Sequence, residues 1–164
     1  MQALVQRCFG AMLFLSLLIP VVAAAQEAKV SRKIAKGEFT VALKPLDFEG
    51  VDAAAKLGRM SIDKRITGDL VATTQGQMLT AVTDVQGSAV YVAVERVTGT
   101  LDGRQGSFVL HHRGVMDRGR ANLSVSVAPD SGTGELAGIA GDFRIAIEGG
   151  KHRYEFEYSL PGTE

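Results

Sequence analysis

The chain has 164 residues, of which 18 are lysine or arginine and 18 are aspartate or glutamate. This even balance provides no basic surface of the kind that nucleic acids and anionic membranes bind, so we expect neither as a partner. The length is that of one domain with a single hydrophobic core.

The first 25 residues are predicted to be a signal peptide. Arg7 supplies the positive charge, residues 9–22 the apolar core, and the alanines at 23–25 the small residues before a cleavage site at Gln26. The alternative is an uncleaved anchor, because residues 8–25 form an uncharged run close to the length that spans a bilayer. The alanines favour cleavage. We therefore expect a periplasmic or secreted protein that starts at Gln26 and has no stable membrane insertion.

The single cysteine, Cys8, lies in this segment. The mature chain is therefore expected to hold no disulfide and no reactive thiol, which suits a bacterial periplasm better than a small disulfide-stapled scaffold. Loss of the segment also removes Arg7, so that 17 basic residues remain against 18 acidic ones and the net charge becomes 17 − 18 = −1.

The start of the mature chain divides into a lead-in and a strand. Residues 26–36 are polar without apolar periodicity, which predicts a mobile lead-in. A single β-barrel domain is predicted over residues 37–161. Its first strand ends at Pro45, which cannot donate a hydrogen bond to a neighbouring strand. A connection over residues 46–57 follows, in which residues 53–56 can form one helical turn.

The next strand, residues 59–67, places one charged side chain among apolar ones. Its apolar face consists of Met60, Ile62, Lys64 and Ile66. The favoured interpretation of Lys64 is a rim residue whose aliphatic stem packs on apolar surface while its amine reaches water. The other interpretation is a cation at the mouth of a cavity.

Two short stretches with strand character follow, at residues 70–74 and 77–83. Gly76 separates them. The glycine marks either a turn between two strands or a bulge within one strand, and the pattern alone does not decide between these interpretations.

The clearest hairpin spans Val90 to Arg113. Its two strands meet at Asp102-Gly103, a dipeptide that favours a type I′ turn and sets the pairing. Counted outward from that turn, Glu95 lies opposite Leu110, and Ala93 lies opposite His112. Because side chains alternate across a strand, one face is expected to point inward. That face carries Tyr91, Ala93, Glu95, Val97, Phe108, Leu110 and His112.

Glu95 and His112 are diagonal neighbours on this inner face. Such neighbours lie roughly 7–8 Å apart along the backbone, within reach of a hydrogen bond or one bridging water. The pair could act as acid and base at neutral pH. The favoured interpretation is a mutually satisfied polar pair, because structural networks also perturb titration.

A strand is predicted over residues 122–128, with a turn at 129–132 and a short helical turn at 133–138. The last hairpin has Gly149-Gly150 as its loop, which sets Ile145 against Tyr154 and Phe143 against Phe156. Its outer face is charged. Its inner face carries Phe143, Ile145, Ile147, His152, Tyr154, Phe156 and Tyr158.

The fold class follows from these elements. No long segment of the mature chain has helical periodicity, and about eight strands follow one another in meander order. Only closure into a barrel removes both edges of such a sheet. We therefore expect an all-β, closed, antiparallel eight-stranded meander barrel.

Several blocks resemble an uncharacterised bacterial family of small proteins named only as a domain of unknown function. They are Gly58 to Lys64, Tyr91 to Arg104, Gly106 to His112, Pro129 to Gly138 and Tyr154 to Tyr158. The resemblance covers Gly37 to Pro161 and implies an allene-oxide-cyclase-like (calycin-like) barrel. Allene oxide cyclases isomerise an oxylipin, but a shared barrel does not transfer a reaction. The family supplies no catalytic residues.

The expected site is the lumen of this barrel. The candidate ligand-binding residues are Glu95, His112, Tyr91, Phe108, Leu110, Tyr154, Phe156, Tyr158 and His152. No catalytic residue is assigned. His111 points to the face opposite His112, and no metal or cofactor motif occurs, so we expect no metal and no cofactor.

Three functions stay open from the sequence. The first is an exported barrel that binds a small apolar, lipid-like ligand in its lumen, which barrels of about eight strands can hold. The second is an isomerase or cyclase that acts on such a ligand through Glu95 and His112. The third is a filled barrel that acts through its surface or as a homo-oligomer.

Overall fold

The computed structural model describes residues 31–162; the predicted signal peptide, its cleavage site and lead-in residues 26–30 lie outside this range. A short 3-10 helix, η1 (Ala53–Ala55), confirms the predicted helical turn. Within residues 31–162, no helix has the length and hydropathy needed to cross a membrane. The strands are β1 (Arg32–Leu46), β2 (Leu57–Gly68), β3 (Leu70–Val82), β4 (Ala89–Leu101), β5 (Arg104–Asp117), β6 (Arg120–Val127), β7 (Thr133–Gly134), β8 (Ala140–Glu148) and β9 (Lys151–Ser159).

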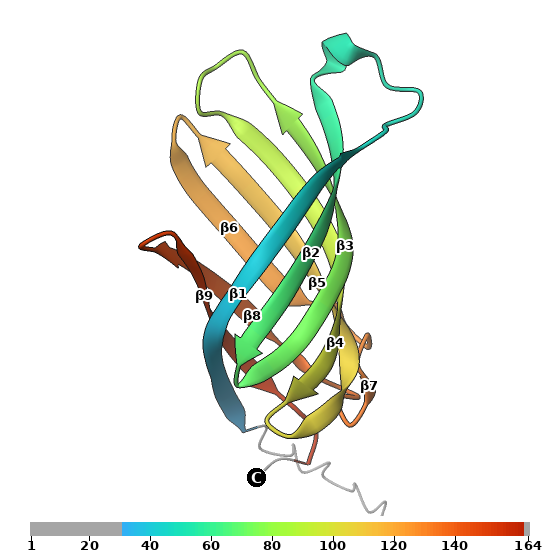
Figure 1. Cartoon of the computed structure of the whole chain (residues 1–164), viewed down its shortest axis with the longest axis vertical. Coiled ribbons are helices and arrows are strands. Elements are labelled where there is room, and N and C mark those ends of the chain that lie inside the picture. Colours follow the sequence, from blue (N-terminus) through green and yellow to red (C-terminus); the bar gives the residue numbers. More distant parts are fainter. Residues whose placement is uncertain (1–30, 163–164) are drawn as a thin grey trace, which may run out of the picture.

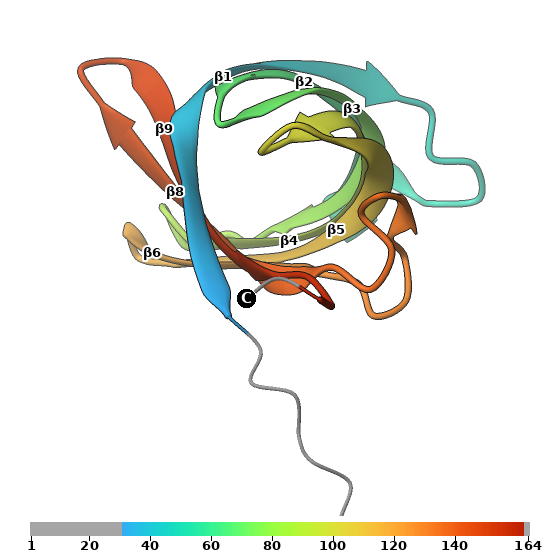
Figure 2. The same ribbon diagram turned by 90° about the horizontal axis from the view of Figure 1, so that it is seen from below.

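Eight of these strands close into a barrel (Figures 1 and 2). The order along the sheet is β4-β3-β2-β1-β9-β8-β6-β5, and pairing of β5 with β4 completes the ring. The two-residue strand β7 pairs with β5 in addition. The predicted all-β, antiparallel eight-stranded meander barrel is therefore confirmed. We call the end that holds the β4–β5 turn the lower end and the opposite end the upper end.

Both predicted hairpin registers are confirmed. In β4 and β5, Glu95 lies opposite Leu110 and Ala93 opposite His112. In β8 and β9, Phe143 lies opposite Phe156. Two-residue turns leave no freedom to slip, because a shift by one residue would turn every apolar side chain outward.

The β4–β5 turn allows a direct test of this register. Asp102 and Gly103 have φ values of 50° and 78°, the left-handed values that a type I′ turn requires at both positions. Replacing Gly103 by valine should lower the free energy of unfolding by about 1–3 kcal/mol, because a β-branched residue is strained there. Urea denaturation measures the change, with Gly103→Asn as the tolerated control. An unchanged midpoint for the valine variant would contradict the turn geometry.

Strand β1 begins at Arg32, five residues before the predicted start at 37, so the prediction of an unstructured lead-in is wrong for residues 32–36. These residues pair with β9 from Arg32 opposite Ser159 to Lys36 opposite Glu155. Their outward charges form ion pairs across the strands, including Arg32 Nη1 to Glu157 Oε1 at 2.8 Å. The apolar Ile34 faces outward, at 53% exposed, and the charged Lys33 shares the inward side with the buried Ala35, so the sequence shows no apolar alternation here.

Gly76 is neither a turn nor a bulge. Strand β3 runs through it in unbroken register with β4, in which Gly76 lies opposite Glu95. A Cβ atom at position 76 would lie 2.5 Å from the Glu95 Cβ atom and 2.5 Å from the Val94 carbonyl oxygen. The glycine therefore permits a close approach of the backbone beside Glu95.

The predicted helical turn at 133–138 is partly right. The segment starts with β7 and then forms hydrogen-bonded turns, with Leu136 N–H donating to the Thr133 carbonyl at 3.1 Å. These turns bring the buried Leu136 and Ile139 side chains against the lower end of the barrel core.

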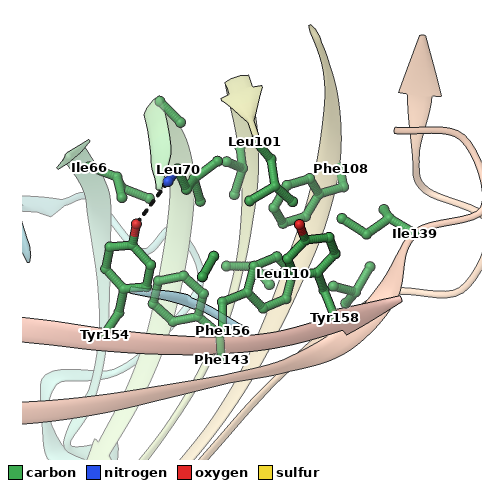
Figure 3. Close-up of a cluster of buried hydrophobic side chains, with 14 of the residues drawn as sticks. Ile66, Leu70, Leu101, Phe108, Leu110, Ile139, Phe143, Tyr154, Phe156 and Tyr158 are labelled. Carbon is green, nitrogen blue, oxygen red and sulfur yellow. Dashed lines mark hydrogen bonds between the residues drawn. The ribbon is translucent and has the colours of Figure 1, made fainter. Parts of the chain in front are cut away.

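The lower half of the lumen is filled by aromatic rings (Figure 3). The Phe156 ring lies 5.6 Å from Phe108, 5.6 Å from Phe143 and 5.3 Å from Tyr158, measured between ring centroids. Tyr154 stacks on Phe143 at 4.9 Å, and its hydroxyl accepts a hydrogen bond from Leu70 N–H at 3.0 Å. These rings pack against one another as a core and leave the polar side chains of the lumen to the upper half.

Candidate functional site

The predicted juxtaposition of Glu95 and His112 is present in the structure. Both residues are nearly inaccessible, at 1% and 4% exposed. His112 Nε2 lies 3.2 Å from Glu95 Oε1, in hydrogen-bond range. Alternation along β4 and β5 points both side chains into the lumen, and the register places them diagonally across the strand pair.

Lys64 joins this pair, and the prediction that its amine reaches water is wrong. The residue is 5% exposed, and its ammonium forms an ion pair with Glu95 Oε1. Lys64 occupies an inward position on β2, opposite Val41 on β1. Since only β3 separates β2 from β4, the long lysine side chain can reach the carboxylate inside the barrel. The alternation had placed Lys64 and Glu95 on inward faces, which was the available signal.

Thr74 completes the group, and sequence reasoning missed it. Its hydroxyl donates a hydrogen bond to Glu95 Oε2 at 3.2 Å, and it accepts one from the backbone N–H of Lys64 at 2.9 Å. Nothing in the pattern distinguishes this threonine from the others on β3. We refer to Lys64, Thr74, Glu95 and His112 together as the ionic cluster.

The electrostatics of the ionic cluster keep Glu95 charged. Burial acts to raise the pKa of Glu95, but the hydrogen bond from His112 and the charge of Lys64 outweigh it, so the pKa lies below its usual value. Burial lowers the pKa of Lys64, against the opposing effect of Glu95. Glu95 is therefore a carboxylate at neutral pH and not an acid that can donate a proton.

This shift has a consequence for acid stability. The folded-state pKa of Glu95 is lower than its usual value of 4.5, so ionised Glu95 stabilises the folded protein. This contribution to the unfolding free energy is complete above about pH 4.5, and it is lost as the pH falls from there through the folded-state pKa. We expect the unfolding free energy of the wild type to fall more steeply than that of Glu95→Gln when urea denaturation is repeated from about pH 6 to about pH 3. Parallel pH profiles would contradict the shift.

Apolar groups enclose the ionic cluster on both sides. Lys64 Nζ lies 5.5 Å from the centroid of the Phe39 ring, a cation–π contact. Above the cluster, a second core group consists of Ile62, Met78 and Ala93, with Tyr91, Met60 and Val41 packed against it.

Tyr91 lies at the boundary between the cluster and solvent. It is half-buried, and burial, together with the charge of Glu95, raises the pKa of its hydroxyl. Its ring packs on Gly114, where a Cβ atom would come within 2.0 Å of a ring carbon. Any larger residue at position 114 would therefore force the Tyr91 ring to move.

Apolar side chains at inward positions near the upper end are exposed to solvent. Leu43 lies opposite Ile62 and Leu123 opposite Gly114 across their strand pairs, and Met116 follows Gly114 on the same face of β5. We call these three residues the cup: Leu43 (45% exposed), Met116 (40%) and Leu123 (42%). Ile147 lies opposite His152, toward the tip of the β8–β9 hairpin, and is 68% exposed.

The predicted ligand-binding residues therefore fall into two groups. Glu95 and His112 belong to the ionic cluster, Tyr91 lies above it, and the half-buried His152 contacts Phe39 at 5.0 Å between ring centroids. The other five lie in the packed lower core and are Phe108, Leu110, Tyr154, Phe156 and Tyr158. Within residues 31–162, no three His, Cys, Asp or Glu side chains gather closely enough to hold a metal ion.

Comparison with known proteins gives a family but no activity. Residues 35–158 match the profile of a family described as a protein of unknown function, DUF3224. A solved structure of a protein of unknown function from the DUF3224 family of Shewanella oneidensis MR-1 shares 45% sequence identity. It superposes with a TM-score of 0.75, covering 82% of this chain and 100% of that one. No curated protein matches the sequence.

Proposed function

The chain belongs to the DUF3224 family of proteins of unknown function, and from that premise we propose that it binds a small apolar ligand at the upper end of its lumen. The observation that carries the proposal is the cup, a set of inward apolar side chains left in contact with water above a buried ionic cluster. Apolar surface that stays exposed to solvent is typical of interaction and ligand sites.

The ionic cluster supports the same proposal. A buried ion pair adds little net stability compared with apolar residues of similar volume, because both charges lose their hydration. The stability of the fold therefore does not explain why these four polar side chains are buried together. Binding the polar end of a ligand would explain it. The packed rings of the lower half restrict the proposed site to the upper half of the lumen.

Isomerase or cyclase activity is the second candidate. It is favoured by the contact of 3.2 Å between His112 and the Glu95 carboxylate, which can orient the imidazole for proton transfer. Because Glu95 stays a carboxylate, its role in the pair would be to hold the His112 imidazole in place for a substrate. Turnover of extracted lipids by the wild type, lost in His112→Gln, would distinguish an enzyme from a carrier.

Export is the other part of the proposal, and it rests on the apolar segment at residues 9–22 and the alanines at 23–25. N-terminal sequencing of protein made in its native cell should give Gln26 as the first residue, with the protein in the periplasmic or secreted fraction. An intact Met1 in the membrane pellet would contradict export with cleavage.

The ligand itself can be sought in protein purified from its native envelope. Mass spectrometry of retained small molecules should find an apolar compound on the wild type and about tenfold less on Leu43→Asp, because a charge in the cup opposes burial of apolar surface. The control is Leu79→Asp, which places the same charge on the outer face of β3 at similar exposure, 43% against 45%. A wild type without ligand, or equal amounts on all three, would contradict binding in the cup.

A further inference from the structure

Backbone pairing in the closed barrel is sparsest between β6 and β8. These strands share one backbone pair, Ser126 opposite Asp142, with Ser126 Oγ donating to Asp142 Oδ1 at 2.7 Å. By contrast, β6 pairs with β5 from Asp117 opposite Arg120 to Leu110 opposite Val127. Toward its tip the β8–β9 hairpin leaves the ring of strands (Figure 2). Above the Ser126–Asp142 pair, the facing edges of β6 and β8 therefore separate.

A groove of about 290 Å³ occupies this separation. This volume is near the lower limit of small-molecule sites, roughly 300–1,000 Å³. We call the groove the side slot. Its polar residues, Ser124, Asp142 and Arg144, belong to the outer face of the barrel. Its apolar residues are Leu123, Val125, Phe143 and Ile145.

The side slot leads to the ionic cluster along both of its walls. On the β6 side, Val125 lies directly opposite His112 on β5. On the β8 side, the Phe143 ring lies 6.5 Å from Phe39, whose ring in turn faces Lys64 Nζ. Leu123 belongs to the cup as well as to the slot. The slot and the cup therefore share Leu123, and single buried side chains, Val125 on one wall and Phe143 with Phe39 on the other, lie between the slot and the cluster.

The ionic cluster can bind an oxygen atom on the inner side of these walls. An ammonium group has three N–H donors. Among residues 31–162, Lys64 Nζ donates a hydrogen bond to Glu95 alone, so the ammonium group retains donors for a ligand. A carbonyl, hydroxyl or carboxylate oxygen would fit this role, whereas a purely hydrocarbon ligand would leave it unused.

From this geometry we infer that the side slot holds the hydrocarbon chain of a single-chain amphiphile whose oxygen-bearing end lies at the ionic cluster. The inference rests on the proposed function and specifies its ligand class. The slot is bounded by two strand edges, which suits one unbranched chain. Its apolar residues would cover the chain, and its polar rim would stay in water.

The test is a fluorescence titration with cis-parinaric acid, a long-chain fatty acid whose polyene can be excited directly. The wild type should bind the probe, and Leu123→Trp should raise the Kd about tenfold, because exclusion of even two methylene groups from the slot weakens binding that much. Leu79→Trp makes the same change at nearly the same exposure, 43% against 42%, but on the outer face of β3, and it should leave the Kd unchanged.

The outcomes separate the two proposals. If the wild type and Leu123→Trp bind cis-parinaric acid equally, the side slot inference is overturned, and binding in the cup is decided separately by Leu43→Asp against Leu79→Asp. If the wild type binds neither this probe nor any compound from its native envelope, the proposed function fails as well. A second measurement needs no variant: the affinity of the wild type should rise from octanoate to oleate as competitors, and equal affinities would overturn the inference.

Discussion

Replacement of Glu95 by glutamine is expected to lower the free energy of unfolding by about 3–5 kcal/mol. The variant leaves the Lys64 ammonium buried without its counter-charge, and a buried, uncompensated charge is among the most destabilising changes a core can suffer. The amide also accepts hydrogen bonds from His112 and Thr74 less strongly than a carboxylate. Urea denaturation at neutral pH measures the effect.

Two further variants isolate the cause. Glu155→Gln breaks ion pairs with Lys36 and Arg144 on the barrel surface, and it should leave the midpoint of urea denaturation close to that of the wild type, because water screens exposed pairs. The double variant Lys64→Met with Glu95→Leu removes both charges and should recover most of the loss. A Glu95→Gln protein within 1 kcal/mol of the wild type would contradict the buried ion pair.

Truncation of Phe156 to alanine is expected to cost about 3–5 kcal/mol as well. The side chain is fully buried, and its ring contacts the rings of Phe108, Phe143 and Tyr158. Its removal takes apolar surface out of the core and leaves a cavity. The strands of the closed barrel are held by hydrogen bonds on both sides, so they cannot move inward to fill it.

The matched control is Ile147→Ala on the neighbouring strand β8. Ile147 is 68% exposed, so its truncation should change stability by no more than about 0.5 kcal/mol. Thermal or urea unfolding of the two variants compares the filled lower core with the exposed end of the β8–β9 hairpin. A small effect for Phe156→Ala would mean that the lower lumen is not packed.

The hairpins could be predicted because the residues that define each one are neighbours in the sequence. Asp102-Gly103 and Gly149-Gly150 are two-residue turns, and each register then follows by counting outward. Glu95 beside His112 came from the same counting. Residues 32–36 could not be assigned in this way, since their pairing depends on β9, at the far end of the chain.

The rest of the site depends on barrel closure. Lys64 meets Glu95 across β3, so the distance between them follows from how three strands curve together. Alternation had placed both side chains inward, but it does not say whether a long cation turns toward water or toward a carboxylate. The same limit applies to Phe143, Phe156 and Phe108: their inward direction was predictable, whereas their mutual packing arises only when two distant hairpins meet.

The central claim is that the upper lumen is a ligand site and the lower lumen is core. It is tested most directly by a crystal structure of the protein purified, without added detergent, from its native cells. The account predicts electron density for a bound molecule against Leu43 and Leu123, with an oxygen atom in hydrogen-bond range of Lys64 Nζ. A cup filled by the protein's own side chains, or one that holds only water, would contradict it.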